Sequence, residues 1–487
     1  MKSFRFKTVG LVVALTCSAG ATLAAPSLQD AVRALGADQA RTLEFSGSGR
    51  WFQFGQAPAP DTPWPPFEVK RYVADLNYET GAARVQISRI QVKEPPRERP
   101  VPVEQRVDQY VRGTTAWSQP VNPPAGSNAS PASQPAAVEE RQAEILATPQ
   151  GFLRAALANH AKLTPVKKGL EVSFTVNGKH RYVGRLDANN DLTSVKTWIS
   201  NPVLGDTLVE TRFFGYKNFG GVRFPGLIER YAGGYPILDL QVAEVKANVP
   251  VDIAVPEAVA KAPVLPVTVK ADRVAEGVYY LTGGTHHSVA IGQRDHVVVV
   301  EAPLNEERSR AVIAKTRELF PGKPIRYLIN THAHFDHSGG LRAFAAEGAI
   351  IVTHEGNKGY YQKVWSAPRK LEPDALARSG KPAKFETFGG RHVISDGNRS
   401  IEVHPISDSG HNDAFAQIWL PQEKILIEAD AYTPTAANVP PPAPANPYSV
   451  NLLGNIQALG LDVKQILALH GPRVVTLDDL RDAVRQK

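Results

Sequence analysis

The stretch INTHAHFDHSGG, residues 329–340, constrains this chain more than any other part of its sequence. It places three histidines and one aspartate within six positions, in a chain of 487 residues with only 13 histidines. His332 and His334 are two apart at the end of a predicted strand, so both imidazoles point to the same side. Asp336 and His337 follow in the turn that begins the next helix, and they approach the same space from another direction. The stretch therefore predicts four metal ligands.

Three further candidate ligands stand at or just beyond the carboxyl ends of short apolar segments. His411 follows IEVHPISDSG, Asp430 ends KILIEAD, and His470 ends KQILALH. Functional loops of sheet-based folds gather at such strand ends, so residues that are distant in sequence can converge there. The sequence therefore predicts that these three side chains join the four of the first cluster.

Seven ligands are too many for one tetrahedral ion and enough for two. Nitrogen and carboxylate ligands without sulfur suit zinc, with iron or manganese as alternatives. The predicted ligands are His332, His334 and His411 for the first ion, Asp336, His337 and His470 for the second, and Asp430 as a bridge between them. Two divalent ions outweigh two aspartates and one hydroxide, and the remaining positive charge favours an anionic or carbonyl-bearing substrate.

The motif THAHFDHSGG resembles the HxHxDH signature of the metallo-β-lactamase superfamily, and SGH, EAD and LHG resemble its later ligand motifs in the same order. The resemblance covers residues 267–487 and implies an αββα sandwich with the metals at one edge of its two sheets. Glu301 stands where the superfamily usually has an aspartate that braces the HxHxDH loop, and glutamate is longer. The cysteine that some β-lactamases of the superfamily use is absent here.

The pattern of apolar and polar residues divides the chain into two folded parts, which together make an α/β protein, or α+β overall. Residues 26–266 are predicted to form a mainly antiparallel β domain with a few helices, because apolar and polar residues alternate in segments such as EVSFTVNG. In 267–487, strands alternate with helices. The linker is expected within 251–277, and a disordered loop is expected near 118–140, which is rich in Pro, Ser and Ala.

Residues 1–25 are predicted to be a signal peptide, with the basic head MKSFRFK followed by a short apolar core. Its cleavage would deliver the protein to the periplasm or outside the cell. That core is too short to span a membrane, and no other segment looks transmembrane. The only cysteine, Cys17, lies in this segment, so the mature protein is expected to lack disulfides. The formal net charge of +7 is not gathered in a basic run, which argues against nucleic acid as a partner.

The predicted function is a secreted or periplasmic binuclear zinc hydrolase, in which a metal-bound hydroxide attacks the carbonyl of an ester, a lactone or an amide, β-lactams included. Asp336 is the predicted catalytic residue, because it can orient the hydroxide and pass its proton to the leaving group. His286 and His287 lie in a hairpin that is expected to approach the metals. His287 and Tyr432 are the predicted substrate contacts.

Two other functions are compatible with the sequence. Some members of the superfamily use a single iron, held by two histidines and an aspartate, to oxidise persulfides, although a complete second site argues against this. In the other alternative, the N-terminal sheet binds a lipid or a polymer and the hydrolase domain is accessory. Residues 216–252 loosely resemble lipoprotein-carrier folds, in which a half-barrel sheet wraps a helix.

Overall fold

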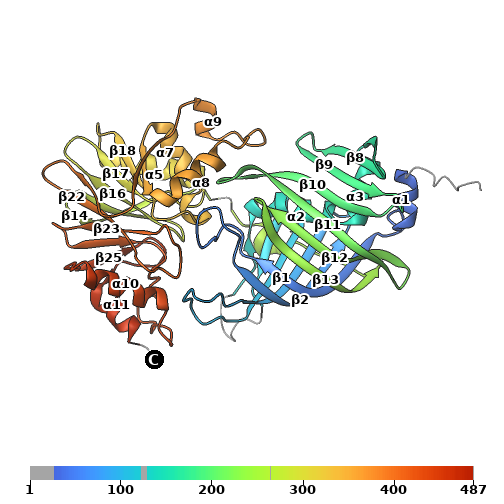
Figure 1. Ribbon diagram of the computed structural model, residues 1–487, viewed down its shortest axis with the longest axis horizontal. Helices are drawn as coiled ribbons and strands as arrows, with labels where there is room; N and C mark the ends of the chain where they lie inside the picture. The colour runs from blue at the N-terminus through green and yellow to red at the C-terminus, as the bar shows by residue number, and fades with distance from the viewer. Residues whose placement is uncertain (1–26, 122–128, 264, 486–487) are drawn as a thin grey trace, which may run out of the picture.

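The computed structural model of the protein describes residues 27–121, 129–263 and 265–485. The chain forms two β-rich parts that lie side by side, with the N-terminal part on the right of Figure 1 and the C-terminal part on the left. The signal peptide expected at 1–25 lies outside the described residues. Within the described ranges, no helix has the length and apolar character needed to cross a membrane.

A thirteen-stranded sheet forms the N-terminal part, in the order β6-β5-β4-β3-β2-β1-β13-β12-β11-β10-β9-β8-β7, and its neighbouring strands pair antiparallel. Its strands are β1 (Thr42–Phe52), β2 (Pro66–Asn77), β3 (Ala82–Gln91), β4 (Gln105–Arg112), β5 (Thr115–Gln119), β6 (Ala132–Ser133), β7 (Lys162–Val166), β8 (Gly169–Val176), β9 (His180–Asp187), β10 (Leu192–Asn201), β11 (Gly205–Phe219), β12 (Val222–Ala232) and β13 (Tyr235–Ala247). The predicted antiparallel β domain is confirmed.

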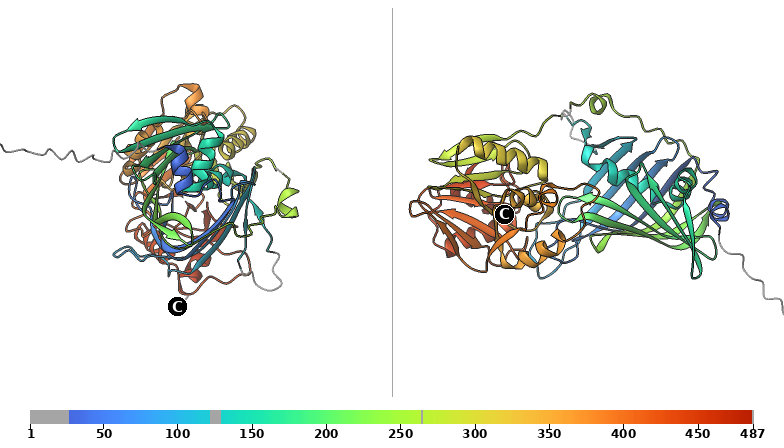
Figure 2. Two further views of the ribbon diagram at one scale, coloured as in Figure 1. Left: turned by 90° about the vertical axis from the view of Figure 1, so that its right-hand side faces the viewer. Right: turned by 90° about the horizontal axis from the view of Figure 1, so that it is seen from above.

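The sheet curls around three helices, α1 (Leu28–Ala34), α2 (Val138–Leu146) and α3 (Pro149–Ala158), as the two views of Figure 2 show. Phe152 of α3 is fully buried, and its ring packs against Phe174 of β8 with the ring centroids 5.1 Å apart. A methyl group on Gly184 of β9 would lie 2.2 Å from Cζ of Phe152. The helix therefore approaches the sheet so closely that only glycine fits beneath this ring.

The segment expected to be a disordered loop near 118–140 contains regular structure in its described part. Strand β5 continues to Gln119, β6 follows at Ala132–Ser133, and the 3₁₀ helix η1 (Pro135–Ala137) leads into α2. Arg141 of α2 donates hydrogen bonds to the carbonyl oxygens of Tyr110 and Trp117, which ties the helix to the β4–β5 hairpin. The composition of the segment could not predict this regular structure, because contacts with strands outside its polar middle stabilise it.

The connection between the two parts is shorter than the sequence indicates. It contains the short helix α4 (Glu257–Ala260) and passes along the outside of the molecule in the right-hand view of Figure 2. The linker was expected to continue to residue 277, but β14 (Lys270–Ala275) already pairs with β15 (Val278–Thr282). The residues of β14 are mostly polar, but they form the edge strand of the sheet because they pair with β15.

Two sheets face each other in the C-terminal part. The first has seven strands, β14, β15, β16 (Ser288–Gly292), β17 (Val297–Val300), β18 (Ile325–Ile329), β19 (Ile350–His354) and β20 (Lys384–Phe388). The second has six strands, β21 (His392–Ser395), β22 (Ser400–Pro405), β23 (Ala416–Leu420), β24 (Ile425–Glu428), β25 (Gln465–Ala468) and β26 (Val475–Thr476).

Helices cover the outer faces of both sheets, which makes the predicted αββα sandwich (Figure 1). Those beside the first sheet are α5 (Glu306–Leu319), α6 (Phe335–Ser338), α7 (Leu341–Glu347), α8 (Glu355–Trp365) and α9 (Ala375–Ser379), and those beside the second are α10 (Pro447–Ala458) and α11 (Leu477–Val484). Thr476 caps α11, since its side chain accepts a hydrogen bond from the Asp479 N–H.

The burial and pairing of strand β17 explain why the candidate functional residues gather at one edge of the sandwich. All four of its valines are fully buried, with Val298 and Val300 in the core between the sheets and Val297 and Val299 in the core beneath the helices. It pairs in parallel with β18, which pairs in parallel with β19. The carboxyl ends of these strands therefore meet at one edge, where the stretch 329–340 begins.

The close approach at Gly184 yields a stability prediction. Gly184→Ala should lower the free energy of unfolding by about 1–3 kcal/mol, because the added methyl group overpacks the Phe152 ring. The measurement is denaturant unfolding of the full chain. Phe152→Leu in the same chain should recover part of the loss, and Gly359→Ala, where no heavy atom lies within 4 Å of the added carbon, is the control. Equal effects of the two alanine substitutions would contradict this account of the core.

Candidate metal centre

The seven predicted ligands lie on loops at one edge of the two sheets, after β18, β24 and β25 and between β22 and β23. Four overlapping groups have one ligand atom of each residue within 4.8 Å of the others. They are His332, His334, His411 and Asp430; His286, His337 and His470; Asp336, His337 and Asp430; and Glu301, His332 and His337. The structure thus brings all seven predicted ligands together and adds two residues.

The first group is compact and buried. Nε2 of His332 lies 3.3 Å from Nε2 of His411, which lies 3.2 Å from Oδ2 of Asp430. Nδ1 of His334 is buried and has no hydrogen-bond partner among the described residues. Burial lowers the pKa of His332 well below its usual value and that of His334 to about 3, and the surrounding imidazoles lower both further. Both imidazoles are therefore neutral, which is the form that binds a metal.

Asp430 of the first group also belongs to the group that contains Asp336 and His337. Oδ1 of Asp430 lies 3.1 Å from Nε2 of His337 and 3.0 Å from Nδ1 of His470. Burial alone would lower the pKa of His337, but the Asp430 and Glu301 carboxylates raise it well above its usual value. Burial would conversely raise the pKa of Asp430, and His337 with its neighbouring imidazoles holds it well below. One oxygen of Asp430 thus faces each group, as a bridging carboxylate requires.

Asp336 is held by a donor on each of its oxygens. Nε2 of Gln56 donates to Oδ1 over 2.8 Å, and Nε2 of His286 lies 3.2 Å from Oδ2. The ring of His286 stacks on that of His470 with the centroids 4.1 Å apart, and the two residues form an isolated β-bridge. His286 is therefore part of the centre, whereas the sequence indicated only that its hairpin approaches the metals.

His287, the predicted substrate contact, lies outside all four groups. It is buried, and its Nε2 donates to the carbonyl oxygen of Gly471 over 2.7 Å. Burial also lowers the pKa of its imidazole. Adjacent residues of an extended segment point to opposite sides, so the side chain that faces the centre is that of His286. A substrate contact at His287 therefore stays a prediction, and the structure places His286 beside the candidate ligands.

Tyr432 does not face the centre either. Its side chain belongs to the core of the sandwich, and its hydroxyl donates to the carbonyl oxygen of Asp479 over 3.3 Å. Its backbone N–H donates to the Glu428 carboxyl, which holds the turn after β24 tight. This turn directs the ring under α11, so the structure assigns Tyr432 to packing.

Glu301 braces the metal loop despite its extra length. It is fully buried, and its φ of 71° lies in the left-handed region that few residues other than glycine adopt. Its Oε2 accepts from the Thr331 hydroxyl over 2.5 Å and from Nδ1 of His337 over 3.1 Å. Its Oε1 accepts from the side-chain amide of Asn330 over 3.1 Å. The unusual backbone compensates for the longer side chain, and the bond to His337 leaves Nε2 to point at the centre.

The N-terminal part reaches into the centre through the β1–β2 loop, residues 53–65. The carbonyl oxygen of Ala57 accepts from Nε2 of His334 and from the side-chain amide of Asn412, each over 3.0 Å. The carbonyl oxygen of Gly55 accepts from the Phe335 N–H over 3.1 Å. The sequence did not predict the role of this loop, because every residue has a backbone carbonyl and residue type does not show which carbonyls support a site. The bond to Ala57 directs Nδ1 of His334 toward the first group.

The donor atoms fit a metal ion. Nδ1 of His334 and Nε2 of His337 are buried without a hydrogen-bond partner among the described residues, which is costly unless a ligand satisfies them. The donors are nitrogen and carboxylate oxygen, a set that suits zinc. The arrangement can therefore hold divalent metal.

Comparison with known proteins supports this interpretation at the level of the superfamily. Residues 281–441 match the family model of the metallo-beta-lactamase superfamily. Metallo-beta-lactamase type 2 of Elizabethkingia meningoseptica is 27% identical over 169 residues, which are 33% of this chain and 60% of that protein. The 2,4-dinitroanisole O-demethylase subunit alpha of Nocardioides sp. (strain JS1661) is 26% identical over 170 residues, 34% of this chain and 47% of that protein. The chain thus spans about half the length of these relatives.

Solved structures are also similar in the C-terminal part. The DIM-1 metallo-beta-lactamase is 14% identical with a TM-score of 0.35, over 45% of this chain and 96% of that one. A metallo-beta-lactamase from Pontibacter korlensis is 17% identical with a TM-score of 0.34, over 45% of this chain and 98% of that one. With the family match, the two facing sheets identify the C-terminal part as a metallo-β-lactamase fold.

The contact between the two parts predicts an effect on metal affinity. Gln56→Ala removes the donor to Oδ1 of Asp336, and loss of such supporting bonds typically weakens metal binding by about 10–100-fold. Competition with a chromophoric chelator measures the affinity of the full chain for zinc. The matched control is Gln53→Ala in the same loop, since the Gln53 side chain makes no hydrogen bond with the described residues. Similar affinities of the two variants would show that Gln56 does not support the centre.

Proposed function

We propose that this chain is a binuclear zinc hydrolase that cleaves the acyl C–O or C–N bond of a small ester, lactone or amide, with β-lactams among the candidate substrates. The observation that carries the proposal is the pair of donor groups that share Asp430. His332, His334 and His411 would hold one ion, and Asp336, His337 and His470 the other, where His337 is common to the group with Asp336 and the group with His470. A single-ion centre would not require the second set of buried donors.

Zinc bound at such a site supplies hydroxide near neutral pH and polarises a carbonyl, which is the chemistry that hydrolysis requires. The contribution of the chain is to orient the reacting groups. Asp336 is ionised, because the His286 hydrogen bond and nearby imidazoles hold its pKa far below the usual value although burial would raise it. With both oxygens fixed by Gln56 and His286, this carboxylate can accept a proton from water and deliver it to the leaving group.

The exposure of the side chains indicates how a substrate enters. The side chain of His470 is 37% exposed and that of Asp336 27% exposed, whereas those of His332 and His337 are inaccessible. The centre is therefore open on the side of Asp336 and His470. This position suits Asp336 for proton transfer to a leaving group that departs toward solvent.

The proposed location is the periplasm or the outside of the cell, which rests on the basic head and apolar core of residues 1–25. The proposed domains are 26–266 and 267–487. Expressing 267–487 alone is a poor test of function, because it removes Gln56 and the carbonyl of Ala57 from the centre. Single substitutions in the full chain separate these effects.

The test of the function combines metal content with activity. Protein purified without added metal should contain about two zinc ions per chain, and chelation should abolish its hydrolysis of at least one of a panel of β-lactams, lactones, esters and thioesters. Asp336→Asn should lower kcat by about 10²–10⁴-fold with an unchanged unfolding curve, because it removes the proton acceptor. One iron per chain without zinc would contradict the proposal and favour persulfide oxidation. Full turnover of Asp336→Asn would overturn the role of this residue.

A further inference from the structure

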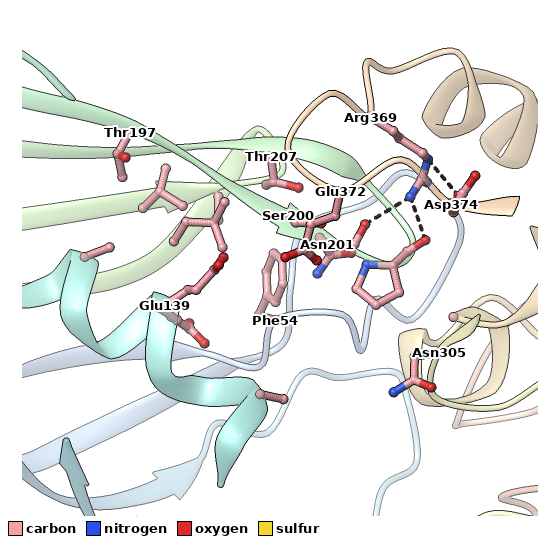
Figure 3. Close-up of a pocket in the computed structure, with 18 of the residues that line it drawn as sticks. Phe54, Glu139, Thr197, Ser200, Asn201, Thr207, Asn305, Arg369, Glu372 and Asp374 are labelled. Atoms are coloured by element: carbon pink, nitrogen blue, oxygen red, sulfur yellow. Dashed lines mark hydrogen bonds and ion pairs between the residues drawn. The ribbon is translucent and has the colours of Figure 1, made fainter. Parts of the chain in front are cut away.

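A cavity of about 630 Å³ lies where the two parts of the chain meet, away from the edge that carries the candidate ligands. Figure 3 shows Thr197 and Thr207 of the large sheet on one wall and Glu139 of α2 on another. Asn305 and Arg369 close it from the C-terminal part. Its volume falls within the range of roughly 300–1,000 Å³ that is usual for small-molecule sites.

The walls that the N-terminal part contributes to the cavity are largely apolar. Val195 and Ile199 of β10 and Val209 of β11 face it from the concave side of the sheet. Ala143 and Ala147 face it from α2, and their small side chains leave the space between helix and sheet unfilled. Apolar walls of this kind gain free energy when hydrocarbon replaces water.

The cavity is distinct from the candidate metal centre. None of the seven predicted metal ligands lines it. Phe54 of the β1–β2 loop forms part of its wall, and the Phe54 ring packs on Phe335, with the centroids 5.3 Å apart. Phe335 precedes Asp336 in the metal loop, so two aromatic rings lie between the cavity and the ligands. A molecule in the cavity would therefore not reach the reacting groups.

The charges around the cavity are unbalanced. Seven carboxylates and four guanidinium groups line it. Five of the seven carboxylates are paired: Glu144 with Arg230, Asp374 with Arg342, Glu306 with Arg378, and both Glu139 and Glu372 with Lys179. Glu140 of α2, in contrast, makes no hydrogen bond or ion pair with the residues that the structure describes. The uncompensated charge inside the cavity is therefore negative, which disfavours an anionic occupant.

We propose that this cavity is a second binding site, for a mainly apolar molecule that carries an uncharged or cationic polar group. The hydrocarbon part lies between the sheet and α2, and the polar group lies against the Glu140 carboxyl, either as a hydrogen-bond donor or as a positive charge. The surrounding protein, and then the Glu144 carboxylate, raise the pKa of Glu140 because they disfavour its charged form, and a donor or a positive charge beside the carboxyl offsets that cost. This inference is independent of the hydrolase proposal, because no metal ligand takes part in it.

The first experiment measures ligand class on the full chain. The neutral fluorophore N-phenyl-1-naphthylamine should bind, and dodecanol and dodecyltrimethylammonium should displace it at concentrations about tenfold lower than dodecanoate, a difference of about 1.4 kcal/mol. Comparison of the first two ligands separates an uncharged from a cationic polar group. Absence of fluorophore binding, or tightest binding by dodecanoate, would overturn the proposal.

The second experiment places the ligand in the cavity. Val209→Trp and Ala143→Phe fill the space from opposite walls, and each should weaken fluorophore binding by about tenfold or more. Leu208→Trp is the matched control, because Leu208 is the neighbour of Val209 on β11, is 39% exposed and points to the other face of the sheet. Unfolding curves establish that each variant is folded.

Equal loss in the Val209 and Leu208 variants, or loss in neither filling variant, would contradict a ligand in this cavity. Loss of binding on chelation would assign the fluorophore to the metal centre and overturn the proposal. Glu140→Gln should abolish any advantage of the trimethylammonium compound over dodecanol. Failure of this second site leaves metal content and hydrolysis unaffected, so it is distinguishable from failure of the proposed function.

Discussion

The carboxylate of Asp430 is the interaction on which the candidate centre depends. Its two oxygens lie within 3.2 Å of His411, His337 and His470, which come from three different loops. Imidazoles gathered this closely and this deeply lose favourable hydration and repel one another when protonated. A fixed negative charge between them offsets part of this cost and orients their nitrogen atoms. Because the carboxyl end of β24 delivers Asp430 to the middle of the sheet edge, the sandwich has to be complete before the centre exists.

The N-terminal part contributes directly to the centre, which explains its close attachment to the sandwich. Its β1–β2 loop supplies the carbonyl of Ala57 and the amide of Gln56. Two other contacts hold the parts together: Arg97 forms an ion pair with Asp413 over 2.8 Å, and Arg369 donates to the carbonyl oxygens of three consecutive residues, Asn201, Pro202 and Val203. The same arrangement encloses the cavity. One interface therefore supports a ligand histidine and forms a separate apolar space.

Spacing predicts candidate ligands better than their surroundings for a physical reason. A metal site demands particular residue types, and strand periodicity places them, so His332 and His334 could be proposed from spacing alone. Spacing could not predict which of His286 and His287 faces the candidate ligands, because neighbouring residues of a strand point to opposite faces and register decides which one faces inward. It could not predict the orientation of Tyr432 either, because the Glu428 carboxyl holds the turn after β24. For Glu301, the backbone conformation decides whether the longer side chain fits.

The sequence by itself determined the αββα sandwich, the antiparallel domain before it and the seven residues that converge at one edge. The sandwich follows from the resemblance of the ligand motifs to those of the metallo-β-lactamase superfamily. The antiparallel domain follows from hydrophobic periodicity, and the seven residues follow from the few types of side chain that bind metal, all of which are local properties of the chain. Only the tertiary structure decided that His286 joins the centre, that Gln56 and Ala57 reach it from the other domain, and that a cavity remains between the two parts. Those features depend on how two surfaces meet, and the identity of a single residue does not determine how distant backbone segments pack.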